Sequence, residues 1–225
     1  MRYYYDNPNN HTNLCNLMPK QIPYLNVFLS SPGDVAEERA IALKIMKRIP
    51  NRFSFKGRVA LNIIAWDDLD ASIPLEAKLT PQEAINKGLP KPSECDIVIV
   101  IFWSRIGTPF TDKNGQVYLS GTHWELLDAL AAEHARTYIY CRKQEPTIGL
   151  RDPNREIKID QYDRLEKFLN SDLFYKNDEI LISINSYDTP ADFEEVLDHQ
   201  FAKIVSDILE SREPDEIFHN TRKFN

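Results

Sequence analysis

The sequence predicts an α/β protein built on a five-stranded parallel sheet. Short apolar runs alternate with longer segments of helical periodicity, which is the pattern of parallel strands joined by crossover helices. The run IVIVIFW at 97–103 is apolar on both faces, as expected for a central strand covered on both sides. The run VFL at 27–29 ends in SSPGD, a polar turn that leads into an amphipathic segment.

The first half of the chain predicts two strands and two helices. We expect a strand over 24–30, a helix over 34–49, a strand over 58–66 and a short helix over 80–87. Asp34 is the expected N-cap of the first helix, and Glu37 completes a capping box. Thr80 and Pro81 open the second helix, and Gly88 follows its end.

The second half predicts three more strands, over 96–103, 137–141 and 179–184, with helices over 122–135, 159–170 and 190–209. Thr122, followed by Glu125, is the expected cap of the first of these helices, and Thr189 caps the last. Right-handed crossovers leave few topologies for such a chain. The expected one is a flavodoxin-like sheet of order 2-1-3-4-5.

The two ends of the chain lack the pattern of the middle. Residues 1–20 have no period and are interpreted as a disordered leader, and Met18 is a candidate for the natural start. Residues 21–210 form the expected α/β domain, and 211–225 read as a polar tail or linker. If the chain is part of a larger protein, a junction after residue 210 is expected.

Composition narrows the function classes. The net charge of −7 and pI near 5.3 argue against nucleic acid as a partner, because phosphate binding needs a basic surface. Cys15, Cys95 and Cys141 show neither zinc nor disulfide spacing, and the last two are expected in the core. No apolar run is long enough for a membrane span, and nothing resembles a signal peptide. We therefore expect a cytoplasmic protein without a membrane partner.

Polar and aromatic residues are predicted to converge at the carboxyl ends of the first three strands. In open α/β sheets ligands bind at that edge, where the strand order reverses. Two connections there, 66–79 and 107–121, are also long enough to suggest function. The candidate site residues are Ser30, Ser31, Gly33, Asp34, Trp66, Asp67, Trp103, Arg105, Trp124 and Glu125.

Each candidate also has a purely structural interpretation. The serines can satisfy turn amides, Asp34 can cap its helix, and Glu125 can pair with Thr122 in a capping box. Asp67 and Asp68 can be loop solvation, Arg105 can pair with an acidic neighbour, and the tryptophans can pack in the core or at its rim. Their common position at one end of one sheet favours the functional interpretation.

Three segments carry a resemblance to a known family: FLSSPGDVAEER from Phe28, CDIVIVIFWSRIGTP from Cys95 and SGTHWELLDAL from Ser120. They resemble TIR-like domains, in the bacterial branch otherwise labelled a domain of unknown function. That branch often stands at the N-terminus of STAND-type (NACHT or NB-ARC) NTPases in antiphage defence. The resemblance runs from about Val27 to Leu209 and implies a TIR-like, flavodoxin-like fold.

In enzymatic TIR domains a helix after the third strand carries a Trp and then a catalytic Glu before Leu. Trp124, Glu125 and Leu126 occupy that stretch here, although Trp and Glu adjoin instead of being several residues apart. The resemblance thus implies cleavage of the nicotinamide–ribose bond of NAD, with Glu125 as the catalytic residue. NAD would be a substrate, and neither a cofactor nor a metal is implied.

The other candidates would bind that substrate. Trp66 or Trp103 would stack on a base, and Arg105 would hold phosphate together with the backbone amides of Ser31 to Asp34. A related interpretation keeps this architecture with another nucleoside or nucleotide as the substrate.

Two other functions stay open. A non-catalytic TIR-like module would only associate with itself or with a signalling partner such as a STAND NTPase, since fold does not decide function. A Mg²⁺-dependent nuclease using Asp34, Asp67, Asp68 and Glu125 is disfavoured by the absence of a basic patch. The burial and partners of Glu125 are expected to separate an enzyme from a module.

Overall fold

The computed structural model describes residues 22–65, 90–112, 114–177 and 179–212. Its central sheet is parallel throughout and has the strand order β2-β1-β3-β6-β9. The strands are β1 (Tyr24–Ser30), β2 (Ala60–Ile64), β3 (Ile97–Phe102), β6 (Arg136–Arg142) and β9 (Ile184–Tyr187). Counted along the chain, this is the predicted order 2-1-3-4-5.

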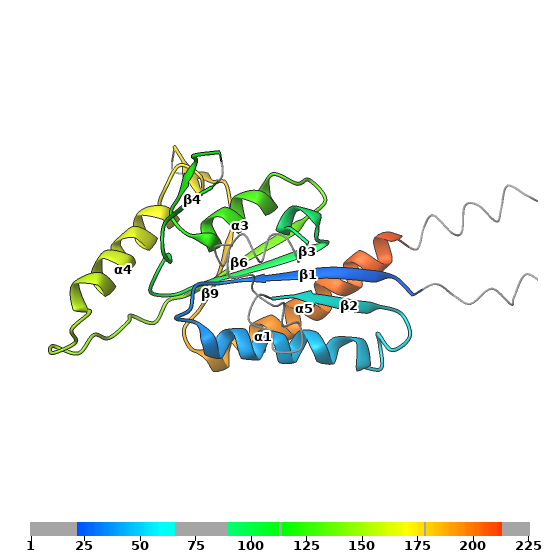
Figure 1. Ribbon diagram of the computed structural model, residues 1–225. Helices are drawn as coiled ribbons and strands as arrows, with labels where there is room; N and C mark the ends of the chain where they lie inside the picture. The colour runs from blue at the N-terminus through cyan, green and yellow to red at the C-terminus, as the bar shows by residue number, and fades with distance from the viewer. Residues whose placement is uncertain (1–21, 66–89, 113, 178, 213–225) are drawn as a thin grey trace, which may run out of the picture.

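Helices of the described residues cover both faces of the sheet (Figure 1). One face packs against α1 (Ala36–Arg48) and α5 (Pro190–Arg212), and the other against α3 (Gly121–Leu130) and α4 (Arg155–Leu169). None of these helices has an apolar stretch of the length that a membrane crossing requires.

The alternation of side chains along β1 and β3 divides the core into two layers. Ile97, Ile99 and Ile101 pack toward α1 and α5, whereas Val98 and Val100 pack toward α3. All six residues of β3 are buried, which confirms that it is a central strand covered on both faces. The predicted core positions Cys95 and Cys141 are buried as well.

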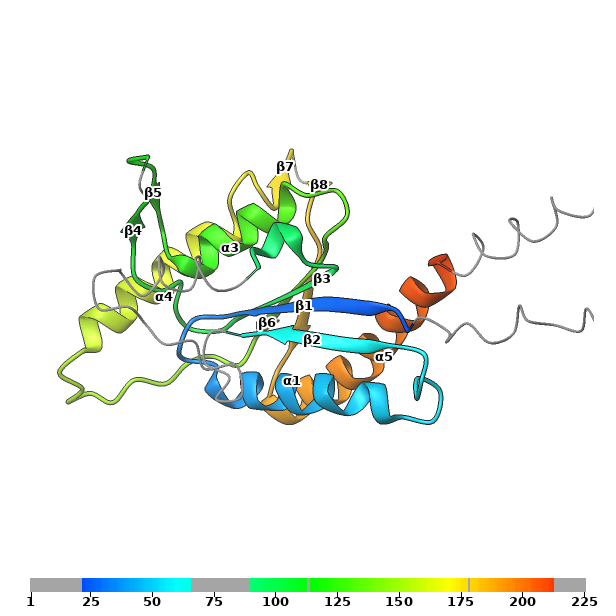
Figure 2. The same cartoon turned by 45° about the vertical axis from the view of Figure 1, so that its right-hand side comes forward.

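Shorter elements complete the described chain. Two 3₁₀ turns, η2 (Ile49–Asn51) and η4 (Pro92–Glu94), precede strands of the sheet. Two small hairpins lie on the α3/α4 side, as Figure 2 shows: β4 (Phe110–Thr111) with β5 (Val117–Tyr118), and β7 (Tyr175–Lys176) with β8 (Glu179–Ile180). The first hairpin occupies most of the long 107–121 connection.

Helix and strand limits differ from the prediction in several places. The strand predicted over 179–184 is wrong, because β8 is part of a small hairpin and the fifth strand of the sheet is Ile184–Tyr187. Helix α4 begins at Arg155, four residues early, and α3 ends at Leu130, five residues short of the prediction. The predicted helix over 80–87 and leader over 1–20 lie outside the described residues.

The last helix begins as predicted. Thr189 Oγ1 accepts a hydrogen bond from the backbone N–H of Asp192 at 3.2 Å, and the Asp192 carboxylate accepts one from the Thr189 N–H at 2.9 Å. This reciprocal pair is a capping box. The helix continues to Arg212, two residues past the predicted domain boundary at 210, and Arg212 pairs with Asp96 at 2.7 Å.

Candidate functional site

The end of β1 directs Ser30, its last residue, and Ser31, the next one, to opposite faces of the sheet. Successive strand residues point in opposite directions, so Ser30 points toward α3 and Ser31 toward α1. Ser30 Oγ donates a hydrogen bond to Glu125 Oε2 at 2.5 Å, and Arg39 Nη1 donates one to Ser31 Oγ at 2.9 Å. All four residues are buried. Sequence reasoning missed Arg39 and its contact with the predicted site residue Ser31.

The start of α3 places Glu125 against β1. Ser120 is the N-cap, and its hydroxyl accepts the backbone N–H of His123 at 3.0 Å, so the predicted cap at Thr122 is wrong. Glu125 lies two residues beyond the N3 position of that cap, so the capping box predicted with Thr122 does not form. Its side chain is only 4% exposed. The helix start therefore gives Glu125 a position inside the protein at the carboxyl end of β1.

Asp34 joins the turn after β1 to the turn after β3. It does not cap α1, because that helix begins at Ala36 and its N-cap, Val35, makes no side-chain hydrogen bond. The predicted capping box with Glu37 is accordingly wrong. Asp34 Oδ2 instead accepts hydrogen bonds from the backbone N–H of Ser104 at 2.8 Å and from its hydroxyl at 2.9 Å. Ser104, which binds this carboxylate in place of the α1 backbone, lies 70 residues further along the chain.

A cavity of about 630 Å³ opens at this edge of the sheet. Its described lining comprises Asp34, Trp103, Ser104, Arg105, Thr108, Glu145, Pro146, Thr147, Ile148, Asn154, Ile157, Lys158, Ile159, Gln161 and Tyr162. The volume lies within the range of small-molecule pockets. Two buried polar atoms of the lining, Asp34 Oδ1 and Arg105 Nε, have no hydrogen-bond partner among the described residues. A buried polar atom without a partner is costly, so both atoms are suited to bind a ligand.

Trp103 directly follows β3 and lines the cavity, and two contacts hold its ring in place. The Arg142 guanidinium lies over its ring, 4.1 Å from the ring centroid, and the indole Nε1 donates to the Gln144 carbonyl at 2.8 Å. Arg142 Nη1 also pairs with buried Glu38 at 3.3 Å. Tyr187 donates its hydroxyl to the same Glu38 oxygen at 3.3 Å.

The residues that hold Trp103 were missed by sequence reasoning. One signal was present, because Glu38 lies on the apolar stripe of α1, three residues after Val35 and four before Ala42. A charged residue on a buried stripe requires a partner from another element. Nothing local to the sequence indicates that this partner is Arg142, at the end of β6.

The backbone conformation of Gly107 determines the path of the chain next to the cavity wall. Its φ of +110° is one that residues with a side chain rarely adopt, and a Cβ there would lie 2.7 Å from Ser120 Cβ. Its N–H donates to Gln161 Oε1 at 3.0 Å. Gly107 therefore links the long connection to both the cap of α3 and the cavity wall on α4.

The remaining predicted site residues are not gathered in the cavity. Gly33 is exposed in the turn, with open space where a Cβ would stand. Trp124 is half-buried, and neither it nor Glu125 is among the described lining of the cavity. Trp66 and Asp67 lie outside the described residues. The structure thus forms two adjoining features: the Ser30–Glu125 pair and the cavity lined by Asp34, Trp103 and Arg105.

Burial shifts the pKa values of titratable side chains near the site. Burial lowers the pKa of His123 from its ordinary value of 6.5, and its Nδ1 accepts the Leu119 N–H at 3.1 Å. Burial raises the pKa of the Cys141 thiol to about 11, so this thiol is protonated at neutral pH. Within the described ranges, no three His, Cys, Asp or Glu residues cluster as metal ligands.

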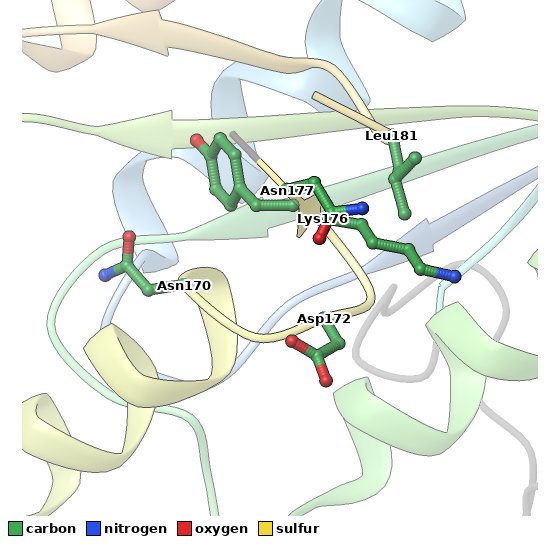
Figure 3. A pocket seen from close by; sticks show the side chains of 6 residues that line it. Asn170, Asp172, Lys176, Asn177 and Leu181 are labelled. Atoms are coloured by element: carbon green, nitrogen blue, oxygen red, sulfur yellow. The ribbon is translucent and has the colours of Figure 1, made fainter. Parts of the chain in front are cut away.

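A second hollow, near β7 and β8, is a weaker candidate for a site because the residues of its described lining are exposed. Its described lining is Asn170, Asp172, Tyr175, Lys176, Asn177 and Leu181, and Figure 3 shows these side chains around it. All six are exposed. We therefore place the candidate site at the carboxyl edge of β1 and β3.

Comparison with known proteins adds no assignment. No protein-family model matches this chain, and no curated protein matches its sequence. A function for this chain is therefore proposed from its residues and their geometry.

Proposed function

We propose that this chain is a TIR-like effector domain that cleaves the N-glycosidic bond of NAD, or of a related nucleotide, when it is assembled. Glu125 is the catalytic carboxylate of this proposal. The observation that carries it is the burial of Glu125 against Ser30 at the carboxyl end of β1. Glu is seldom fully buried unless it is paired, and a buried carboxylate at a ligand-binding edge is a candidate functional group.

The position of the pair within the sheet supports the proposal. The strand order is compatible with the flavodoxin-like fold expected of a TIR-like domain. Strands β2 and β3 flank β1, so the chain reverses its direction of winding there, and ligands bind at the carboxyl edge beside such a point. Both the Ser30–Glu125 pair and the cavity occur at this edge.

The chemistry needs one well-placed carboxylate. The bond between ribose C1′ and the nicotinamide nitrogen breaks, and its electron pair neutralises the pyridinium ring. Water adds to C1′ through an oxocarbenium-like transition state and loses a proton, which gives nicotinamide, ADP-ribose and H⁺. In the proposal, the Glu125 carboxylate stabilises the positive charge that develops on the ribose. Ser30 holds the carboxylate in one orientation.

The cavity would bind the rest of the substrate. Trp103 offers a ring face for a base, Arg105 a donor for phosphate, and Asp34 an acceptor for a hydroxyl or amine. Ser31, Gly33, Trp124, Trp66 and Asp67 remain candidate substrate-binding residues from the sequence. In a defence setting, a STAND NTPase or another partner would drive assembly.

The test is release of nicotinamide from NAD. The purified chain is assayed alone at high concentration and fused to a domain that forces oligomers, and products are separated by chromatography. We expect nicotinamide and ADP-ribose in equal amounts, with more product from the forced oligomer. Failure of both formats to release nicotinamide, with circular dichroism showing an intact fold, would contradict the proposal for NAD.

The second candidate is a non-catalytic module that acts by self-association. It is favoured by exposed apolar side chains at the start of α4 and in the loop before it: Leu150 (86% exposed), Ile157 (62%) and Ile159 (41%). We call these three residues the α4 patch. The three residues are close in sequence, and exposed apolar patches often mark interaction surfaces. The same patch would also serve the assembly that the enzymatic proposal requires.

A further inference from the structure

We propose that the Trp103 wall of the cavity binds the neutral purine base of a nucleotide and disfavours a cationic pyridinium ring. The inference rests on the proposed function, because it fixes which end of a dinucleotide enters the cavity. It uses a feature that the reaction itself does not: the guanidinium of Arg142 on one face of the Trp103 ring.

Arg142 already occupies the position over the Trp103 ring at which a cation would bind. The face of an indole ring attracts positive charge, and Arg142 occupies one face at 4.1 Å from the centroid. In this proposal a base in the cavity stacks on the ring face away from Arg142, because Trp103 lines the cavity and Arg142 is not among its described lining. A pyridinium there would share the ring with the guanidinium that the π electrons already face, so it would gain less from cation–π attraction. A neutral purine does not depend on that attraction.

The guanidinium is held in this position by buried Glu38 and by Gln144. Glu38, 1% exposed, pairs with Arg142 and also accepts the Tyr187 hydroxyl. Gln144 accepts from the Arg142 Nε at 3.1 Å, and its carbonyl accepts the Trp103 indole N–H at 2.8 Å. Arg142 therefore cannot leave the ring to a cationic ligand without separating from a buried carboxylate.

The polar groups of the lining match the rest of a purine nucleotide. Arg105 Nε is a buried donor without a partner, suited to a phosphate oxygen. Asp34 Oδ1 is a buried acceptor without a partner, suited to a ribose hydroxyl or a base amine. With NAD as the substrate, the adenine nucleotide half would fill the cavity. The nicotinamide riboside would extend toward Glu125, which lies outside the described lining.

The experiment compares two mononucleotides that differ in their base. Adenosine monophosphate and nicotinamide mononucleotide are titrated by calorimetry into the full chain carrying Glu125→Gln, so that neither is consumed. We expect the adenine nucleotide to bind about tenfold or more tightly. Trp103→Leu should weaken its binding by a similar factor, since the stacking surface is lost.

The control removes the charge from the ring without leaving a buried ion unpaired. In the double variant Glu38→Gln/Arg142→Met, both charges of the ion pair are replaced, and the Met side chain is long enough to pack on the indole. We expect the preference for the adenine nucleotide to fall toward one. A preference that stays unchanged in this folded variant would contradict the role of Arg142.

Other outcomes also decide the inference. Equal or tighter binding of nicotinamide mononucleotide, or no binding of either nucleotide at millimolar concentration, would overturn it. Binding is measured without turnover, so the result is separate from nicotinamide release by the unmodified chain. A preference for the purine nucleotide without NAD cleavage would support this inference and contradict the proposed reaction. NAD cleavage without that preference would support the reaction and contradict this inference.

Discussion

At the residue scale, the site depends on side chains that do not take the helix-capping roles predicted from their sequence positions. Glu125 is buried against Ser30 instead of completing a capping box, and Asp34 accepts two hydrogen bonds from Ser104 instead of capping α1. Each local role was a reasonable expectation, because Asp and Glu favour the first turn of helices. The contacts that replace them span 95 and 70 residues of sequence, respectively.

His123 predicts a dependence of stability on pH. Burial lowers its pKa, so folding favours the neutral ring, whose Nδ1 accepts the Leu119 N–H. The sign follows: this contribution to the free energy of unfolding is complete above the unfolded pKa near 6.5 and is lost as the pH falls toward the lower folded pKa. Thermal melts between about pH 7 and 5.5 should show a falling midpoint, above the range where most carboxylates titrate.

The matched variant for this prediction is His123→Gln, which retains a side-chain acceptor but does not titrate. The fall in midpoint over that pH range should be smaller in the variant than in the unmodified chain. An identical pH dependence in the two proteins would show that another group is responsible.

At the scale of elements, the sequence predicted what periodicity and burial determine. Strand β1 has the predicted limits, β3 is the predicted central strand, and α5 begins at the predicted cap, Thr189. These elements carry strong local signals: an apolar run buried on both faces, or a Thr and an Asp at the spacing of a capping box. Of the predicted site, Asp34, Trp103 and Arg105 do line one cavity.

The fifth strand was misplaced because its signal is weak. The sequence predicts this strand over 179–184, but Ile180 and Leu181 are exposed and the sheet pairs Ile184–Tyr187 with β6. An edge strand has only one neighbour, so its sequence, INSY, needs less apolar character. Only the register with β6 identifies it, and register depends on long-range packing.

The cap of α3 gives a prediction at this scale. Replacing Ser120 by Ala removes the acceptor for the His123 N–H and should lower the free energy of unfolding by about 1 kcal/mol. Thr122→Val, which keeps the side-chain shape at the cap that the sequence suggested, should cost less. Urea unfolding of both variants measures the difference. A larger loss in Thr122→Val would mean that the helix begins where the sequence predicted.

At the scale of the whole molecule, the two candidate functions share one expectation, which is self-association. Two residues of the α4 patch, Ile157 and Ile159, also line the cavity. Assembly through this patch would therefore bring a second copy of the chain to the site. An enzyme switched on by assembly would use such a coupling, and a signalling module would use the patch alone.

Leu150→Glu tests the patch without touching the described cavity lining. A charge at this exposed position should shift the chain toward monomer in analytical ultracentrifugation, because it would have to be buried unpaired in the interface. Phe53→Glu is the control, since Phe53 is fully exposed but follows η2, elsewhere in the fold. Equal effects of the two substitutions, or none from Leu150→Glu, would remove the α4 patch as the interface.

The most direct measurement is the rate of nicotinamide release from NAD by the forced oligomer, compared between Glu125→Gln and Glu133→Gln. Glutamine at 125 keeps the shape and an oxygen for Ser30 but not the charge, whereas Glu133 is an exposed residue just beyond the same helix. We predict that release falls at least about a hundredfold in Glu125→Gln, as for loss of a group that stabilises transition-state charge, and stays unchanged in Glu133→Gln. Release that survives in a folded Glu125→Gln protein would contradict the central role given to this carboxylate.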